Sequence, residues 1–399
     1  MSQDSTTRAG QLHTLFKAGV DAVGGRQATQ RTLQQFSLSG QVHLVALGKA
    51  ADAMAAGALA VLGDKLVSGL VITKHDHLSQ AIREDERLEC HEAGHPVPDE
   101  ASLIAGERLS DYVAAIPSEH MLVFLVSGGT SALVEHLNDG LDLTDLKRET
   151  DQLLASGAAI GEMNRHRRTL SQIKGGKLAR RVRCPVLQLL ISDVPGDKPG
   201  DIGSGLLVPD EATGMGPELA IWDTIDTHII ASSGIAQEAV ADAAEYLSLP
   251  VRQARGSLDG DMPEVVSRLA GVLSDETLQP GVYIWGGEPT LVLPASPGRG
   301  GRNQHLALSL AEHLVDGPPC SVLVCGTDGT DGPTADAGGL VNEQTLAKAR
   351  DGGLNIDDYL ARADAGSCLE RLDALVTTGP TGTNVMDLAI AVVGERSAD

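Results

Sequence analysis

The chain has 399 residues, of which 42% are hydrophobic and 21% are charged, a balance typical of a folded globular protein. At roughly 100–200 residues per domain, we expect two domains or a few more. The 54 acidic residues outnumber the 31 basic ones and give a formal charge of -23, which argues against general binding to nucleic acid or to an anionic membrane. Aromatic residues make up only 2%, too few for a base-stacking platform.

The five cysteines are scattered, and none has CxxC spacing. Their odd number argues against a disulfide framework, and their spacing argues against a zinc ribbon. The N-terminus carries Asp4 and no long apolar stretch, so we expect no secretory signal. The longest apolar runs fall short of a membrane span. We therefore expect a reduced, soluble, cytoplasmic protein.

The first half of the chain predicts two opening helices, between Arg8 and Phe36, and then a series of buried strands. Short apolar runs, each closed by glycine and small polar residues and followed by a helix-like stretch, occur at 42–47, 69–73, 121–126 and 186–191. Because these runs are continuous rather than alternating, both faces of each strand are buried, which predicts a mainly parallel sheet between layers of helices. We assign residues 1–230 to this α/β domain.

The pattern changes near residue 230. Residues 282–293 predict a strand, a turn and a returning antiparallel strand. A Leu-rich helix over 306–314 follows, and further strands are predicted at 321–325, 375–378 and 388–393. We place a second α/β domain, with a mixed sheet, over residues 231–399.

Glycine-rich loops follow several predicted strands, at the sheet edge where open α/β sheets bind ligands. Lys49 comes at the start of a helix, where a cation is unfavourable unless an anionic ligand is bound, although it could also be a surface lysine on a tight turn. Ser127-Gly128-Gly129 resembles a phosphate cradle without Walker spacing, and a well-capped turn is the alternative.

A basic segment stands out in this acidic chain. Residues 163–183 contain eight Lys or Arg and no acid, which indicates an anion site unless the segment is a solvated basic helix face. Within it we favour Asn164, Arg165 and Lys174, because Gly175-Gly176 permits close approach of a ligand to the lysine.

Acidic and basic side chains also follow glycines at other strand ends. Asp193 ends the run at 186–191, where it could hold magnesium, orient a lysine, accept a hydroxyl proton or simply cap a turn. Glu288 follows two glycines in the predicted hairpin. Arg302 follows another two and precedes Asn303, so its guanidinium could bind a carboxylate or phosphate through two hydrogen bonds. Asp328 and Asp331, three apart in a Gly-rich turn, could share a cation.

Taken together, these loops resemble the bacterial-type glycerate 2-kinase family, whose second domain is the MOFRL domain. The matching strings run in order from near residue 41 to near 390: VALGKAADAM, GHPVPDEAS, VSGGTSALVE, IKGGKLA, SDVPGD, VPD, WGGEPT, GRGGRNQ, GTDGTDGPTADAGG and TGPTGTN. The resemblance implies a Rossmann-like first domain, a mixed α/β second domain and an active site in the cleft between them. It also implies phosphorylation of D-glycerate at the 2-hydroxyl by ATP, with Mg²⁺ or another divalent cation, giving 2-phosphoglycerate and ADP.

The family's essential lysine and arginine fall on Lys49 and Arg302. We expect both to stabilise the transferring phosphoryl group and to hold the acid, because phosphoryl transfer needs positioning and charge neutralisation more than covalent help. Other groups would position anions: the 127–129 loop, Asn164, Arg165, Lys174 and Asn303. Three carboxylates are candidates for binding the metal or accepting the hydroxyl proton, with Asp193 also counted as catalytic: Asp193, Glu288 and Asp328.

Four places depart from the family's usual pattern: His305, Leu206-Leu207, Met386 and Thr169. The acid that is accepted therefore stays open, as does whether the chain forms a homodimer. One alternative is a reductase acting on hydroxypyruvate or tartronate semialdehyde, but no predicted strand is followed by GxGxxG. Another is a non-catalytic protein that binds an organic acid or nucleotide, which the intact Lys49 and Arg302 argue against. We expect small-molecule partners and neither nucleic acid nor membrane.

Overall fold

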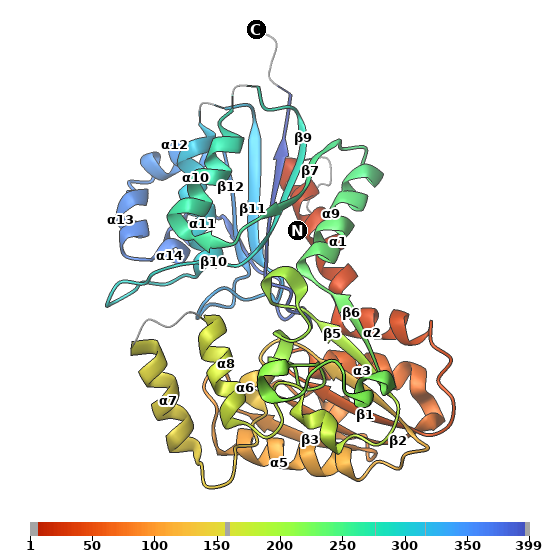
Figure 1. Cartoon of the computed structure of the whole chain (residues 1–399). Helices are drawn as coiled ribbons and strands as arrows, with labels where there is room; N and C mark the ends of the chain where they lie inside the picture. Colours follow the sequence, from red (N-terminus) through yellow and green to blue (C-terminus); the bar gives the residue numbers. More distant parts are fainter. Residues whose placement is uncertain (1–6, 156–159, 276, 316, 396–399) are drawn as a thin grey trace. The chain divides into compact units, whose positions relative to one another are not determined.

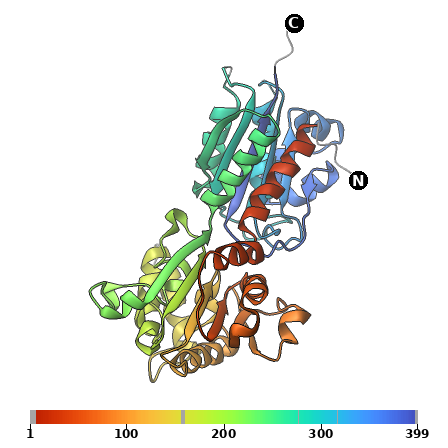
Figure 2. The ribbon, with the colours of Figure 1, turned by 90° about the vertical axis from the view of Figure 1, so that its right-hand side faces the viewer.

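The computed structural model describes residues 7–155, 160–275, 277–315 and 317–395. The chain divides into two compact units, which we describe separately. The parallel unit comprises residues 24–231 and 382–384, and the mixed unit comprises residues 1–23, 232–381 and 385–399. Both sheets are visible in Figures 1 and 2.

The parallel unit contains a six-stranded sheet, and all neighbouring strands run parallel in the order β3-β2-β1-β4-β5-β6. The order reverses direction between β1 and β4, which is the strand order of a Rossmann fold and the place where such sheets bind ligands. This confirms the predicted parallel domain. The strands are β1 Val42–Leu47, β2 Leu66–Lys74, β3 Leu88–Ala93, β4 Met121–Val126, β5 Val186–Ile191 and β6 Ile225–Ala231.

Helices pack against this sheet because its strands are apolar along their length. Every residue of β1 and β5 is buried. Helix α3 (Ala51–Leu62) contacts β1 and β2, while α5 (Glu100–Ala114) joins a core cluster with alternate residues such as Val45 and Phe124. A capping box between Asp99 and Ser102 fixes the start of α5. The remaining α-helices of this unit are α2 Gly25–Leu33, α4 Gln80–Arg83, α6 Thr130–Leu133, α7 Leu143–Ala155 and α8 Ile160–Leu170.

The mixed unit has its own six-stranded sheet, in the order β13-β12-β11-β14-β9-β7. Only β7 and β9 pair in parallel, and the other neighbours are antiparallel, as predicted for a mixed sheet. The strands are β7 Val251–Ser257, β9 Gly281–Gly287, β11 Cys320–Gly326, β12 Gly338–Asn342, β13 Leu375–Val376 and β14 Asp387–Val393. Beside it, β8 (Gly260–Asp261) and β10 (Pro289–Thr290) form a separate parallel pair.

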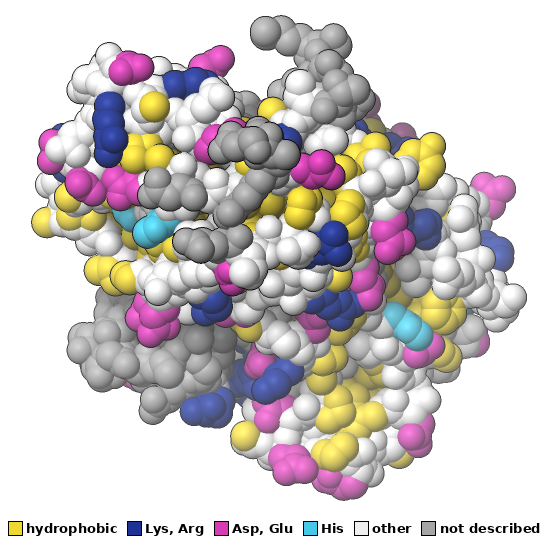
Figure 3. Space-filling model, turned by 90° about the horizontal axis from the view of Figure 1, so that it is seen from above, with side chains coloured by type: hydrophobic (Ala, Val, Ile, Leu, Met, Phe, Trp, Pro, Cys, Tyr) yellow, Lys and Arg dark blue, Asp and Glu magenta, His cyan; other side chains and the backbone are white. Residues whose placement is uncertain are grey.

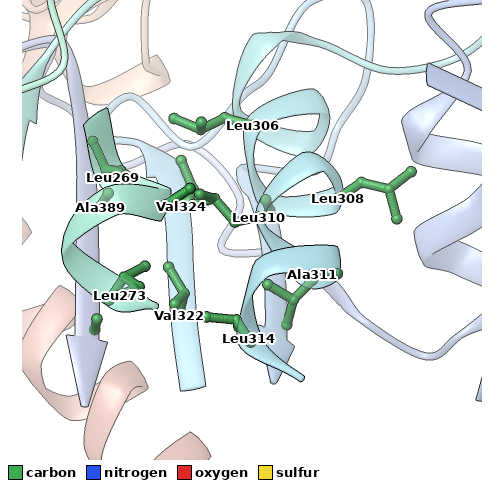
Figure 4. Close-up of a cluster of buried hydrophobic side chains, with 14 of the residues drawn as sticks. Leu269, Leu273, Leu306, Leu308, Leu310, Ala311, Leu314, Val322, Val324 and Ala389 are labelled. Carbon is green, nitrogen blue, oxygen red and sulfur yellow. The ribbon is translucent and has the colours of Figure 1, made fainter. Parts of the chain in front are cut away.

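Helices cover both faces of the mixed sheet. Two of them, α1 (Arg8–Val23) and α9 (Ser233–Tyr246), lie side by side on one face (Figure 2). The others lie on the opposite face: α10 Met262–Leu273, α11 Arg302–Leu310, α12 Thr345–Asp351, α13 Ile356–Ala361 and α14 Ala365–Arg371. Figure 4 shows leucines of α10 and α11 meeting Val322 and Val324 of β11 in the core that holds the start of α11 in place.

Two sequence predictions are wrong. The first helix, placed in the 1–230 domain, belongs to the mixed unit, because α1 packs on α9, β11 and β14. The predicted hairpin over 282–293 does not form, since β9 takes β14 as its antiparallel partner. After β9 the chain leaves the sheet: the Glu288 N–H donates to Asp259 Oδ1 (3.0 Å), and Pro289 pairs with Gly260.

The cysteines, all five of which are described, are unpaired. Among the described residues, no helix combines the length and apolar character needed to cross a bilayer. On the face shown in Figure 3, Asp and Glu side chains stand at many separate places, so the negative charge is dispersed over that face.

Candidate functional site

The carboxyl ends of β1 and β4 are joined by hydrogen bonds between their loops. The Lys49 N–H donates to the Gly128 carbonyl (2.9 Å). The Ser127 hydroxyl accepts from the Ala50 N–H (3.0 Å) and donates to the Leu47 carbonyl (3.1 Å). Ser127 is fully buried, so its hydroxyl fixes the two loops to each other, in contrast to the ligand-binding role expected from the sequence.

The Lys49 side chain projects from this joint. Among the described residues, no hydrogen bond or ion pair engages its ammonium. A Cβ added at Gly129 would lie 3.1 Å from Lys49 Cγ and 3.2 Å from His95 Nε2, so the lysine stem and the imidazole flank the same glycine. Burial, together with the charges of Lys49 and Lys74, lowers the pKa of His95 to about 4. A neutral imidazole therefore lies beside an unpaired ammonium.

Sequence reasoning gave His95 no role. It lies in the GHPVPDEAS string that was matched to the family, and that string was the only available signal. Its proximity to Lys49 depends on tertiary structure, because the two residues follow different strands.

Asp193 lies against the same glycine loop. A Cβ at Gly128 would overlap its carboxylate, so only glycine permits this approach. The structure thus brings Lys49, Gly128, Gly129 and Asp193 together at the point where the strand order reverses. This arrangement offers a cation, the half-buried backbone of Gly129 and a carboxylate to one small ligand.

The basic segment contributes differently from the prediction. Lys174 is fully buried: its ammonium forms an ion pair with Glu135 and donates to the Ser131 carbonyl (2.8 Å), so it is not available to a ligand. Arg165 is exposed on α8. Asn164 is also on α8, but its side chain lies outside the described residues.

In the mixed unit, Arg302 begins α11 and is held between two carboxylates. Its Nε donates to Asp387 Oδ2 (2.6 Å), and its Nη1 pairs with Glu288 Oε1 (2.5 Å). Burial opposes the charge, yet Asp387 and Glu288 raise the pKa of the guanidinium above its ordinary value. Burial raises the pKa of Asp387 to about 6, although Arg302 works to lower it.

Asn303 and Asp331 stabilise the start of the same helix. Asn303 is 1% exposed and its Nδ2 donates to Asp387 Oδ1 (2.9 Å), so it supports Arg302's partner, and its predicted contact with a ligand stays a prediction. The Asp331 carboxylate accepts the N–H groups of Asn303 (3.1 Å) and Gln304 (2.8 Å). Burial raises the pKa of Asp331 to about 7.

Asp328 and Asp331 both accept hydrogen bonds from the protein, and their sharing of a cation stays a prediction. Both Asp331 oxygens serve the helix start, and Asp328 Oδ1 accepts from the Thr330 N–H and hydroxyl, each at 3.0 Å. No group of three potential metal ligands occurs among the described His, Cys, Asp and Glu side chains. Asp193 belongs to the parallel unit, and Glu288 and Asp328 belong to the mixed unit, so metal binding by these three carboxylates stays a prediction.

A pocket of about 380 Å³ opens beside Arg302. Glycine backbone and the Arg302 and Glu288 side chains provide its polar wall, and Leu291 and Leu293 provide an apolar wall. A small anion in this pocket would bind the Arg302 guanidinium by replacing the Glu288 carboxylate.

Two family models and several known proteins are similar in sequence to this chain. Residues 11–237 match a domain of unknown function, DUF4147, and residues 281–387 match the MOFRL family. A D-glycerate 2-kinase of Thermotoga maritima is 37% identical, over 95% of this chain and 97% of its own length. A relative in Agrobacterium vitis, provisionally named a hydroxypyruvate reductase, is 35% identical over 96% of this chain and 94% of its own.

A solved structure is also similar. The crystal structure of the glycerate kinase of Thermotoga maritima matches with a TM-score of 0.87 at 34% identity, covering 97% of this chain and 99% of that one. Sequence and fold agree over nearly the whole length of both chains. The chain therefore belongs to the glycerate 2-kinase family with a C-terminal MOFRL domain.

Proposed function

We propose that this chain transfers the γ-phosphoryl group of ATP to the 2-hydroxyl of D-glycerate, giving 2-phosphoglycerate and ADP. The observation that carries the proposal is the unpaired Lys49 ammonium beside the 127–129 loop, where the strand order reverses. An anion bound there gains a charge-assisted hydrogen bond without first breaking a protein ion pair.

The side chains support this chemistry by charge and position. Lys49 neutralises oxygens of the transferring phosphoryl group, as phosphoryl transfer requires. Asp193 either accepts the proton of the 2-hydroxyl, while that oxygen forms its bond to phosphorus and the bond to the ADP oxygen breaks, or holds the divalent cation. The neutral His95 imidazole can hydrogen-bond a hydroxyl without adding charge. In the mixed unit, Arg302 binds a carboxylate or phosphate of the substrates.

A divalent cation enters this scheme with the nucleotide. Magnesium in kinases is commonly held by one or two carboxylates and the phosphates of the substrate rather than by a full protein cage. Asp193 is the carboxylate that lies at the glycine loop, and it would serve as the protein ligand if the cation binds there. A different group would then have to accept the hydroxyl proton.

The direct test is incubation with ATP, magnesium and D-glycerate, followed by phosphorus NMR of the product. We expect 2-phosphoglycerate; 3-phosphoglycerate would refute the regiochemistry, and no phosphorylated acid would refute the kinase assignment. NADH absorbance with hydroxypyruvate tests the reductase, which is disfavoured because the β1–α3 turn offers a single glycine, Gly48, before Lys49.

The Lys49→Ala variant tests whether the Lys49 ammonium takes part in phosphoryl transfer. We expect kcat to fall on the order of a hundredfold, as for loss of one preorganised electrostatic contact in a transition state. The matched control is Lys147→Ala, an exposed lysine of α7 in the same unit. If both variants fold and keep wild-type turnover, Lys49 is not a catalytic group.

A further inference from the structure

Asp387 is a buried carboxylate to which the sequence analysis assigned no role. It is the first residue of β14, and its side chain is 2% exposed. Its neighbours across the sheet are Gly326 on β11 and Gly287 on β9, neither of which has a side chain. Two glycines therefore leave room at the end of the sheet for this carboxylate and its partners.

Among the described residues, the hydrogen-bond partners of the Asp387 carboxylate all come from the first turn of α11. Oδ2 accepts from Arg302 Nε (2.6 Å), and Oδ1 accepts from Arg302 Nη2 (3.4 Å) and Asn303 Nδ2 (2.9 Å). Contact with both Nε and Nη2 fixes the plane of the guanidinium as well as its position.

The opposite edge of the same guanidinium has a different environment. Nη1 pairs with Glu288, whose side chain is 43% exposed and lines the pocket of about 380 Å³. Solvent can replace an exposed partner at little cost, whereas a buried charge cannot lose its partner without a large desolvation penalty. Arg302 thus has one permanent partner and one exchangeable edge.

We propose that Asp387 is a positioning residue that holds Arg302 so that its Nη1 edge faces the anionic substrate. This inference rests on the proposed kinase function. Arginine has a long side chain that loses much rotamer freedom when it binds. Because Asp387 fixes the side chain beforehand, substrate binding does not have to order it again.

Asp331 provides the matched control. Its buried carboxylate supports the same helix start, but through the backbone N–H groups of Asn303 and Gln304. Asp331→Asn therefore disturbs the helix terminus without removing a hydrogen bond from the guanidinium. Circular dichroism and thermal unfolding of both variants would establish that they fold.

The kinetic experiment is a double-mutant cycle. We expect Asp387→Asn to lower kcat/KM about ten- to a hundredfold in the wild-type background and to have little further effect when Arg302 is already alanine. The effect of Asp331→Asn should depend much less on the background, because Asp331 acts on the guanidinium through its charge and not through a hydrogen bond. If the effect of Asp387→Asn is equally large without Arg302, the positioning role is refuted.

A second experiment measures the chemical reactivity of Arg302 and does not depend on enzyme activity. Phenylglyoxal modifies arginine, and peptide mass mapping gives the rate at Arg302 alone. We expect Asp387→Asn to raise that rate severalfold and Asp331→Asn to leave it near the wild-type value. Equal rates in all three proteins would overturn the proposal. Failure of the kinase function would instead appear as an inactive wild-type enzyme, with the modification rates still informative about Asp387.

Discussion

The buried pair of Lys174 and Glu135 allows a quantitative prediction for the parallel unit. Both side chains are 0% exposed, and the only other contact of the ammonium among the described residues is the Ser131 carbonyl. Burial lowers the pKa of Lys174, whereas the charge of Glu135 supports the protonated form. Glu135→Gln keeps the shape but removes this charge, so the ammonium stays buried without a counterion.

Breaking one side of a buried ion pair costs roughly 3–5 kcal/mol. For a domain of about 150–250 residues, each kcal/mol lowers Tm by roughly 2–4 °C. The parallel unit, residues 24–231 and 382–384, falls within this size range. We therefore expect Glu135→Gln to lower the Tm of this unit by about 6–20 °C in differential scanning calorimetry.

Two comparisons separate charge from packing. Glu89 pairs with Arg108 in the same unit, but these side chains are 37% and 42% exposed, so Glu89→Gln should cost about 1 kcal/mol or less. Replacing both partners, as Glu135→Leu with Lys174→Met, should recover most of the loss, because apolar side chains of similar size often substitute for buried ion pairs. If Glu135→Gln and Glu89→Gln shift Tm equally, the reasoning is refuted.

Three further outcomes are expected. Arg302→Lys should lower kcat/KM about ten- to a hundredfold in steady-state assays, because the single ammonium of lysine cannot contact Asp387 and a second anion as the two edges of the guanidinium do. Arg299→Lys should lower kcat/KM threefold or less, because the Arg299 side chain is 40% exposed. Gly128→Ala should displace the Asp193 carboxylate and lower kcat about tenfold or more while circular dichroism stays unchanged. Burial lowers the pKa of His95 from 6.5 to about 4, so between these pH values the unfolded chain binds a proton on His95 and the folded chain does not. The free energy of unfolding therefore falls as the pH drops from 6.5 to about 4. In urea unfolding, the His95→Asn variant should lose less stability over this pH range than the wild type.

The main strands of the parallel sheet were predictable because the apolar signal there is strong. β1, β4 and β5 match their apolar runs residue for residue. The edge strand β3, with sequence LECHEA, was missed because its charged residues are only half-buried and give no apolar run. The predicted hairpin after β9 failed for another reason: the residue that pairs with β9 lies about a hundred positions later in the chain, on β14. Local turn signals carry no information about such a partner.

In the candidate site, too, the sequence predicts positions that follow from strand ends but not those that depend on a distant partner. Lys49, Gly128 and Asp193 could be expected together, because each directly follows a parallel strand and such strands end at one edge of the sheet. The burial of Lys174 could not be expected, because its partner Glu135 lies in a separate segment and is hidden with it. A basic residue beside two glycines gives the same local pattern whether it binds a ligand or an internal carboxylate.

What distinguishes Lys49 from Lys174 is therefore its partner. The chain contains 54 acidic residues and has a formal charge of -23, so carboxylates that could pair with a lysine or arginine are abundant. Arg302 is paired with two of them, and Lys174 is paired with one. Among the described side chains, Lys49 has none, although Asp193 approaches the same loop. A cation left unpaired in so acidic a protein is poorly stabilised until an anion binds, and that cost is recovered when a phosphate or carboxylate binds beside it. Binding of such an anion should therefore stabilise the wild-type parallel unit more than the Lys49→Ala variant.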